Sequence, residues 1–125
     1  SAYANQYCFP GTIAPIASYT LLKHAADAAE KIGAKAVVGS VFTADQFYDA
    51  NPDSAAKYRE MSILAVEMET AGLYLTAAKA GKQALSILTI SDLVFTGEGL
   101  TADERQNSFT EMMEIALETA WKSLD

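Results

Sequence analysis

The chain has 125 residues, half of them hydrophobic. It contains nine Lys and Arg and sixteen Asp and Glu, which gives a net charge of −7. The length allows one domain whose apolar core needs neither disulfides nor a metal. The acidic balance argues against a nucleic-acid or anionic-membrane surface, and no apolar run approaches the roughly 20 residues that span a bilayer. With one cysteine, Cys8, and no secretion signal, we expect a cytoplasmic protein.

The first part of the chain contains a loop and then a helix. Residues 1–11 hold several aromatic side chains and a Pro-Gly turn signal without a regular period, so we expect an irregular loop. A chain that opens in such a loop is expected to be part of a longer one. Apolar side chains then recur every three or four residues between residues 15 and 32, which predicts an amphipathic helix that ends at Gly33.

Strands and helices alternate in the middle of the chain. The apolar run at residues 35–44 predicts a strand. Residues 54–61 favour a short helix with Asp53 or Ser54 as its N-cap. A second buried strand is predicted at residues 63–66, directly before two carboxylates.

The alternation continues toward the carboxyl end. Residues 69–80 predict a helix closed by Gly81, and residues 83–91 predict a third strand. The two glycines of residues 93–100 indicate that this segment is a mobile lid that covers a ligand. This order of elements indicates an α/β fold with mostly parallel strands.

The last helix carries the clearest start signal. Thr101 and Glu104 are spaced as a capping box, in which each side chain binds a backbone amide of the other residue. The helix is predicted to run nearly to the end of the chain. Its apolar side chains are predicted to share one face: Phe109, Met112, Met113, Ala116, Ala120 and Leu124.

Polar side chains follow two of the predicted strands. Glu67 and Glu69 come directly after the strand at residues 63–66, and Ser91-Asp92 ends the next strand. Ligands of open α/β sheets bind outside the carboxyl ends of strands, so we expect these two ends to lie side by side around a ligand. An acidic pair at a helix start is also commonly a cap that complements the helix dipole, and Ser-Asp is a common N-cap. Both interpretations stay open.

Taken together, these features resemble one family, the bacterial hexameric type of purine nucleoside phosphorylase within the nucleoside phosphorylases. The resemblance rests on residues 66–72 (VEMETAG), on Ser91-Asp92, on Glu104-Arg105-Gln106 and on residues 41–48. It implies that residues 1–125 form a single, partial domain, the carboxyl-terminal half of a three-layer phosphorylase-type fold. In that fold, helices flank a mostly parallel mixed sheet.

The chemistry points to Asp92 as a catalytic acid. Cleavage of the N-glycosidic bond to a purine is easier when the leaving base is protonated in the transition state. A carboxyl group that burial keeps protonated suits this task, and Asp92 terminates an otherwise apolar strand. The resemblance implies that Arg105 closes onto Asp92, where a guanidinium favours the ionised acid and so drives the proton toward the base.

The other predicted site residues bind the nucleoside. Glu69 is predicted to accept hydrogen bonds from two vicinal ribose hydroxyls and to stabilise positive charge on the sugar. Met68 would pack on the apolar face of the sugar, and Phe47 on the purine ring. The remaining predicted contacts lie on the base side or beside the acid: Val66, Glu67 and Ser91.

The activity that the resemblance implies is reversible phosphorolysis of purine (deoxy)ribonucleosides to purine base and (deoxy)ribose 1-phosphate. Phosphate is then a co-substrate, and neither a cofactor nor a metal is expected. The family's phosphate-binding residues belong to its amino-terminal half. The expected protein partners are either further copies, in the hexamer of dimers that the resemblance implies, or that complementary half. The alternatives are a hydrolytic methylthioadenosine/adenosylhomocysteine nucleosidase and a non-catalytic nucleoside-binding fragment. The preference between 6-oxo and 6-amino purines stays open.

Overall fold

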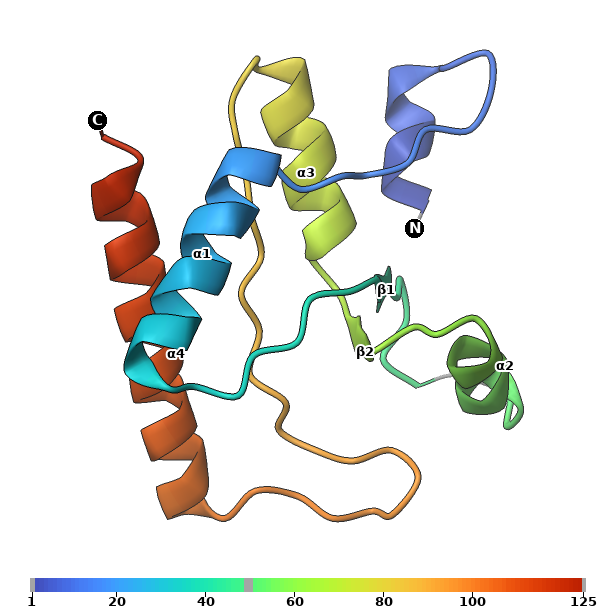
Figure 1. The fold of residues 1–125 in the computed structure, drawn as a ribbon. Coiled ribbons are helices and arrows are strands. Elements are labelled where there is room, and N and C mark those ends of the chain that lie inside the picture. The colour runs from blue at the N-terminus through green and yellow to red at the C-terminus, as the bar shows by residue number, and fades with distance from the viewer. Residues whose placement is uncertain (1, 49–50, 125) are drawn as a thin grey trace. The chain divides into compact units, whose positions relative to one another are not determined.

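The computed structural model describes residues 2–48 and 51–124, and it contains helices and a small parallel sheet (Figure 1). The elements in chain order are η1 (Ala2–Tyr7), α1 (Tyr19–Ile32), β1 (Val41–Thr43), α2 (Ser54–Glu60), β2 (Ala65–Glu67), α3 (Thr70–Lys79) and α4 (Ala102–Lys122). The predicted α/β class is confirmed.

The chain divides into two compact units, which are described separately. The first unit comprises Ser1–Ala17 and Gly39–Ala84, and the second comprises Ser18–Val38 and Leu85–Asp125. The organisation of residues 1–125 as a single domain stays a prediction. Among the described residues, no helix combines the length and the apolar character needed to cross a membrane.

The sheet of the first unit is a parallel pair of short strands. The register joins Val41 to Ala65, Phe42 to Val66 and Thr43 to Glu67. Parallel strands require a crossover, and here α2 lies within it, with the Tyr58 ring stacked on Phe42 at a centroid distance of 4.4 Å. Of the strand predicted at residues 35–44, only the three residues of β1 form a strand, because only they pair with β2.

The start of the chain is more regular than predicted. Residues 2–7 form the 3₁₀ helix η1, so the expectation of an irregular loop was wrong there. The Tyr3 hydroxyl lies 2.8 Å from the Thr76 hydroxyl of α3, and the Tyr3 ring lies over Gly72. The small residues at the start of α3 thus allow η1 to pack closely against the helix.

The glycine stops of two helices are confirmed. Gly33 after α1 and Gly81 after α3 have φ angles of 71° and 64°, a left-handed conformation that costs glycine little. In both helices, the amide of the next residue donates to a carbonyl five residues earlier, at 3.0 and 2.8 Å. The helix α1 begins at Tyr19 rather than at residue 15, directly after its cap Ser18, whose hydroxyl accepts from the Leu21 amide.

The second unit has its core between α1 and α4. The buried residues of this core are Ala25, Ala28, Ala29 and Ile115. The capping box of Thr101 and Glu104 is confirmed, and hydrogen bonds from Thr101 hold the pKa of the Glu104 carboxyl below its usual value. The predicted apolar face of α4 is mostly exposed, and the helix buries Ile115 and Thr119 instead.

The alanines of α1 explain this difference. They present a flat surface that accepts Ile115 and the small Thr119, whose hydroxyl is satisfied by the Ile115 carbonyl at 2.7 Å. Of the six residues predicted for the face, only Met112 is half-buried. Four other large apolar side chains of α4 are 42–73% exposed, namely Phe109, Met113, Leu117 and Trp121, and Leu124, just after the helix, is 81% exposed.

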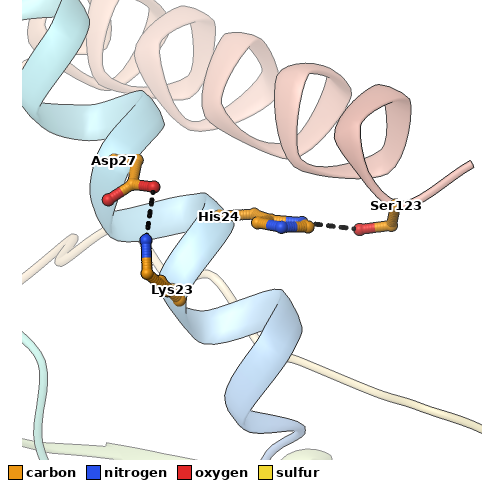
Figure 2. A network of polar contacts seen from close by, with 4 residues as sticks. All are labelled: Lys23, His24, Asp27 and Ser123. Carbon is orange, nitrogen blue, oxygen red and sulfur yellow. Dashed lines mark hydrogen bonds and ion pairs between the residues drawn. The ribbon is translucent and has the colours of Figure 1, made fainter. Parts of the chain in front are cut away.

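Polar contacts within α1 and between α1 and the end of α4 accompany this packing. Figure 2 shows His24 of α1 facing Ser123, just after α4, with His24 Nδ1 3.1 Å from the Ser123 hydroxyl, beside an ion pair between Lys23 and Asp27 of α1. Because the Ser123 hydroxyl already donates to the Thr119 carbonyl at 2.7 Å, His24 Nδ1 is the donor. Exposed ion pairs of this kind contribute at most about 1 kcal/mol.

The third predicted strand is not formed. Residues 82–91 belong to neither a helix nor a strand, although Leu85 and Ile87 pack against the core of the second unit. A strand requires a hydrogen-bonded neighbour, and within the described ranges no neighbouring strand pairs with this segment. The apolar run predicted a buried strand, but this segment is not paired, and its Leu88 and Ile90 side chains are 45% and 47% exposed.

Candidate active site

The predicted site residues fall into two groups that belong to different units. Phe47, Val66, Glu67, Met68 and Glu69 are in the first unit. The second unit holds the predicted acid, its neighbour and the predicted arginine: Asp92, Ser91 and Arg105. The meeting of the two groups around one ligand therefore stays a prediction, and each group has its own geometry.

The residues 66–69 connect the end of β2 to the start of α3. Val66 is paired with Phe42 in the sheet, and Met68 and Glu69 lie in the turn between strand and helix. Glu69 is the N-cap residue of α3, yet its side chain makes no capping hydrogen bond. Its carboxylate is exposed, in the position at a strand end where α/β proteins bind ligands.

The neighbouring carboxylate of Glu67 is engaged instead. Glu67 Oε2 accepts from the backbone amides of Glu69 at 2.7 Å and Thr70 at 2.6 Å. Glu67 Oε1 accepts from the Thr43 hydroxyl, and that hydroxyl accepts in turn from the Ala71 amide at 3.0 Å. Side chains from β1 and β2 thus bind three successive amides at the start of α3, which a helix leaves without partners of its own.

This environment favours the charged form of Glu67. Partial burial by itself raises the pKa of Glu67, but hydrogen bonds from the Thr43 hydroxyl and from the Thr70 and Glu69 amides outweigh it. The pKa of Glu67 therefore lies below its usual value. A carboxylate at the positive end of a helix also complements the helix dipole.

The two interpretations of the acidic pair can now be separated by residue. The capping interpretation is confirmed for Glu67 and does not apply to the side chain of Glu69. Sequence reasoning missed Thr43, which is the partner of Glu67. The sequence could have identified Thr43 only through the register of the two strands, because Thr43 and Glu67 are the last residues of strands that pair in parallel.

The predicted base-stacking residue lies in the crossover after β1. The Phe47 ring is 78% exposed and meets the Tyr48 ring edge to face, with centroids 5.0 Å apart. An exposed aromatic ring offers a large apolar surface to a flat ligand. The geometry leaves Phe47 accessible, and its contact with a purine stays a prediction.

In the second unit, Ser91 and Asp92 begin a loop closed by backbone hydrogen bonds. The Ser91 hydroxyl donates to Asp92 Oδ2 at 2.6 Å, as expected for a residue that orients the acid. Asp92 and Gly99 pair in an isolated antiparallel β-bridge, and the Leu100 amide donates to the Ser91 carbonyl at 2.9 Å. Asp92 is exposed, so the burial predicted for it is not present in the described part of the chain.

The predicted arginine cannot be placed beside this acid. Arg105 belongs to the first turns of α4, and its side chain lies outside the described part of the structure. The predicted closure of Arg105 onto Asp92 therefore stays a prediction.

A hollow in the first unit lies away from the predicted site residues. It has a volume of about 390 Å³ and lies between the start of the chain and α3. Its lining includes Cys8, Phe9, Ile13 and Leu75, and none of the predicted site residues. Within residues 2–48 and 51–124, no three His, Cys, Asp or Glu side chains cluster as a metal site would require.

Comparison with known proteins supplies the family. The family model described as the phosphorylase superfamily matches residues 3–124. Over 117 residues, the chain is 53% identical to a purine nucleoside phosphorylase DeoD-type of Bacillus cytotoxicus, 55% to one of Clostridium perfringens and 51% to one of Bacillus cereus. These matches cover 93% of this chain and 50% of each relative, so the chain spans about half the length of these curated relatives. The chain belongs to the phosphorylase superfamily.

Proposed function

We propose that this chain is the nucleoside-binding half of a purine nucleoside phosphorylase. The observation that carries the proposal is the exposed Glu69 carboxylate at the end of a parallel strand, left unused by the helix that it caps. The similarity to relatives named purine nucleoside phosphorylase supports the assignment of the substrate. The proposed reaction converts a purine nucleoside and phosphate to free purine and ribose 1-phosphate.

The first unit binds the sugar in this proposal. Glu69 accepts hydrogen bonds from the two ribose hydroxyls, and its charge stabilises the oxocarbenium-like sugar as the bond to the base breaks. Met68, beside it in the turn, packs on the sugar. Phe47 and Val66 contribute apolar surface to the base, and Phe47 has the exposure that such a contact requires.

The second unit supplies the proton. Asp92 donates it to the imidazole nitrogen of the purine, oriented by the Ser91 hydroxyl that binds its Oδ2. Arg105 favours the ionised Asp92 and so promotes the transfer. Closure of residues 93–100 over the base would exclude water from this step.

Phosphate, the second substrate, is held by residues outside this chain. The proposed complementary half supplies them, and the enzyme completed in this way forms an oligomer of the hexameric type in the cytoplasm. The chain spans half of its relatives' length, which supports the need for such a partner. No cofactor or metal takes part in the proposed reaction.

The test is purine release from inosine, measured with and without phosphate. The chain is assayed alone and after mixing with the half of the Bacillus cytotoxicus relative that it does not match. We expect hypoxanthine and ribose 1-phosphate only when both halves and phosphate are present. The unmatched half alone is the control.

Two other results would contradict the proposal. Release of hypoxanthine with free ribose in the absence of phosphate would indicate a hydrolytic nucleosidase. Binding of inosine, followed by NMR, without release under any condition would indicate a non-catalytic nucleoside-binding fragment.

A further inference from the structure

The start of α3 is held by a side-chain pair that the proposed reaction does not use. Thr43 and Glu67 end the two parallel strands and face each other across the sheet register. Between them they bind the amides of Glu69, Thr70 and Ala71. The Glu67 carbonyl also accepts from the Ala44 amide at 2.7 Å, so both strand ends are fixed by side chain and backbone.

This arrangement separates two tasks that one carboxylate would otherwise have to share. The side chain of an N-cap residue commonly accepts a hydrogen bond from its own helix, and a carboxylate used in this way would be less available to a ligand. Because Glu67 and the Thr43 hydroxyl bind those amides, the Glu69 side chain is exposed and makes no capping bond. The turn that carries Glu69 is nevertheless held at its own amide by Glu67.

We propose that Thr43 and Glu67 are positioning residues, which fix the turn between β2 and α3 and so aim the Glu69 carboxylate at the vicinal hydroxyls of ribose. This inference rests on the proposed function for the role of Glu69. It reassigns Glu67 from the base pocket to the support of the sugar site and adds Thr43 to that support. Neither residue needs to touch the substrate.

Amide hydrogen exchange in the 125-residue chain tests the support directly. Thr43→Val keeps the shape and strand preference of the side chain but removes the hydroxyl, and Glu67→Gln keeps the size but removes the charge. We expect Glu67→Gln to speed exchange at residues 69 and 70 by about ten- to a hundredfold, as for loss of hydrogen bonds to a charged group, and Thr43→Val to speed it at residue 71 by about tenfold, as for loss of a neutral hydrogen bond. Thr43→Ser, which retains the hydroxyl, is expected to exchange like the original chain.

Two controls make this measurement specific. Thr76→Val makes the same substitution farther along α3, where the hydroxyl binds Tyr3, and it is expected to leave exchange at residues 69–71 unchanged. The amides of α4, in the second unit, report on general unfolding in every variant. Unchanged exchange at residues 69–71 in both Thr43→Val and Glu67→Gln would overturn the proposal.

The pH dependence of the NMR signals of the same amides gives a second prediction. The pKa of Glu67 is lowered in the folded chain, so the support is complete above the ordinary carboxyl value of about 4.3 and is lost as pH falls through the lowered value. We expect the NMR shifts of the Glu69 and Thr70 amide protons to be constant above the ordinary carboxyl range and to move as pH falls through the lowered pKa of Glu67. In Glu67→Gln this movement should be absent. Its persistence there would assign the titration to another group.

Substrate selectivity separates positioning from a merely structural role. Inosine offers two vicinal hydroxyls to Glu69, whereas 2′-deoxyinosine offers one. In the complete enzyme, we expect Thr43→Val to lower kcat/KM about tenfold or more for inosine and only a few-fold for 2′-deoxyinosine. Thr43→Ser should restore both. Equal losses for the two substrates would indicate a structural defect and overturn the positioning role.

The remaining outcomes separate this proposal from the proposed function. If Glu67→Gln instead changes the ratio of activity on inosine and adenosine, Glu67 belongs to the base pocket and the reassignment is wrong. If the complete enzyme with the original sequence releases no purine, the proposed function fails. The exchange rates then still decide whether Thr43 and Glu67 hold the turn.

Discussion

Replacing Asp92 with Asn is expected to lower phosphate-dependent purine release by about 10²- to 10⁴-fold, the usual contribution of a general acid. The amide can still accept the hydrogen bond that Ser91 now makes to Asp92, so the loop keeps its contacts while the transferable proton is lost. The measurement is kcat for inosine in the enzyme completed by the unmatched half of the Bacillus cytotoxicus relative.

The matched control for this experiment is Asp103→Asn. Asp103 is also exposed and lies in the second unit, at the start of α4, and it has no role in the proposed reaction. Its replacement should leave kcat within about twofold of the original value, since substitutions on an exposed surface rarely change stability by more than ±0.5 kcal/mol. Near-normal turnover by Asp92→Asn would remove Asp92 from the acid role.

Replacing Glu69 with Gln is expected to lower kcat/KM for inosine by about 100-fold or more. Each hydrogen bond to a charged group contributes about 1.5–3 kcal/mol, and the amide loses both the charge and one acceptor toward the two hydroxyls. The loss should be smaller for 2′-deoxyinosine, which has one hydroxyl fewer. Steady-state kinetics of both substrates in the completed enzyme give the two values.

The control for Glu69 is Glu60→Gln, the same substitution on an exposed carboxylate at the end of α2 in the same unit. It is expected to leave both substrates unaffected. Equal and large losses in Glu69→Gln for inosine and 2′-deoxyinosine would place the carboxylate away from the sugar hydroxyls.

The helix ends of this protein were predictable because their signals are local. Gly33 and Gly81 stop their helices by a left-handed conformation at one residue, and Thr101 and Glu104 complete a capping box within one turn. Each signal lies within a few residues of the feature that it specifies. Tertiary contacts did not need to be known.

The strands and the helix face were less predictable because they depend on partners distant in sequence. Residues 83–91 have the alternating pattern of a strand, but pairing requires a neighbour that the pattern does not identify. On α4, the long apolar side chains indicated one face, and the flat alanine surface of α1 selected another around Ile115. Small side chains on one helix leave room for a larger one on the facing helix, and Ile115 fills that room.

The candidate site shows the same division. The position of Glu67 and Glu69 at a strand end was evident from the sequence, and so was the possibility that one of them caps the helix. Which of the two caps it depended on where Thr43 lies, and that follows from the parallel register of β1 and β2. The residue types identified the two candidate carboxylates, and the pairing of the strands showed which of them caps the helix.

The Thr43–Glu67 contact also sets the order in which this region can fold. The two residues are separated by 24 positions, so their contact forms only after the crossover closes, at an entropic cost that rises slowly with its length. Until then, the first amides of α3 lack these two side chains as partners, and isolated short helices are marginal in water. We therefore expect strand pairing and the start of α3 to form together. On this expectation, a nascent chain acquires an oriented Glu69 only when both strands have emerged and joined.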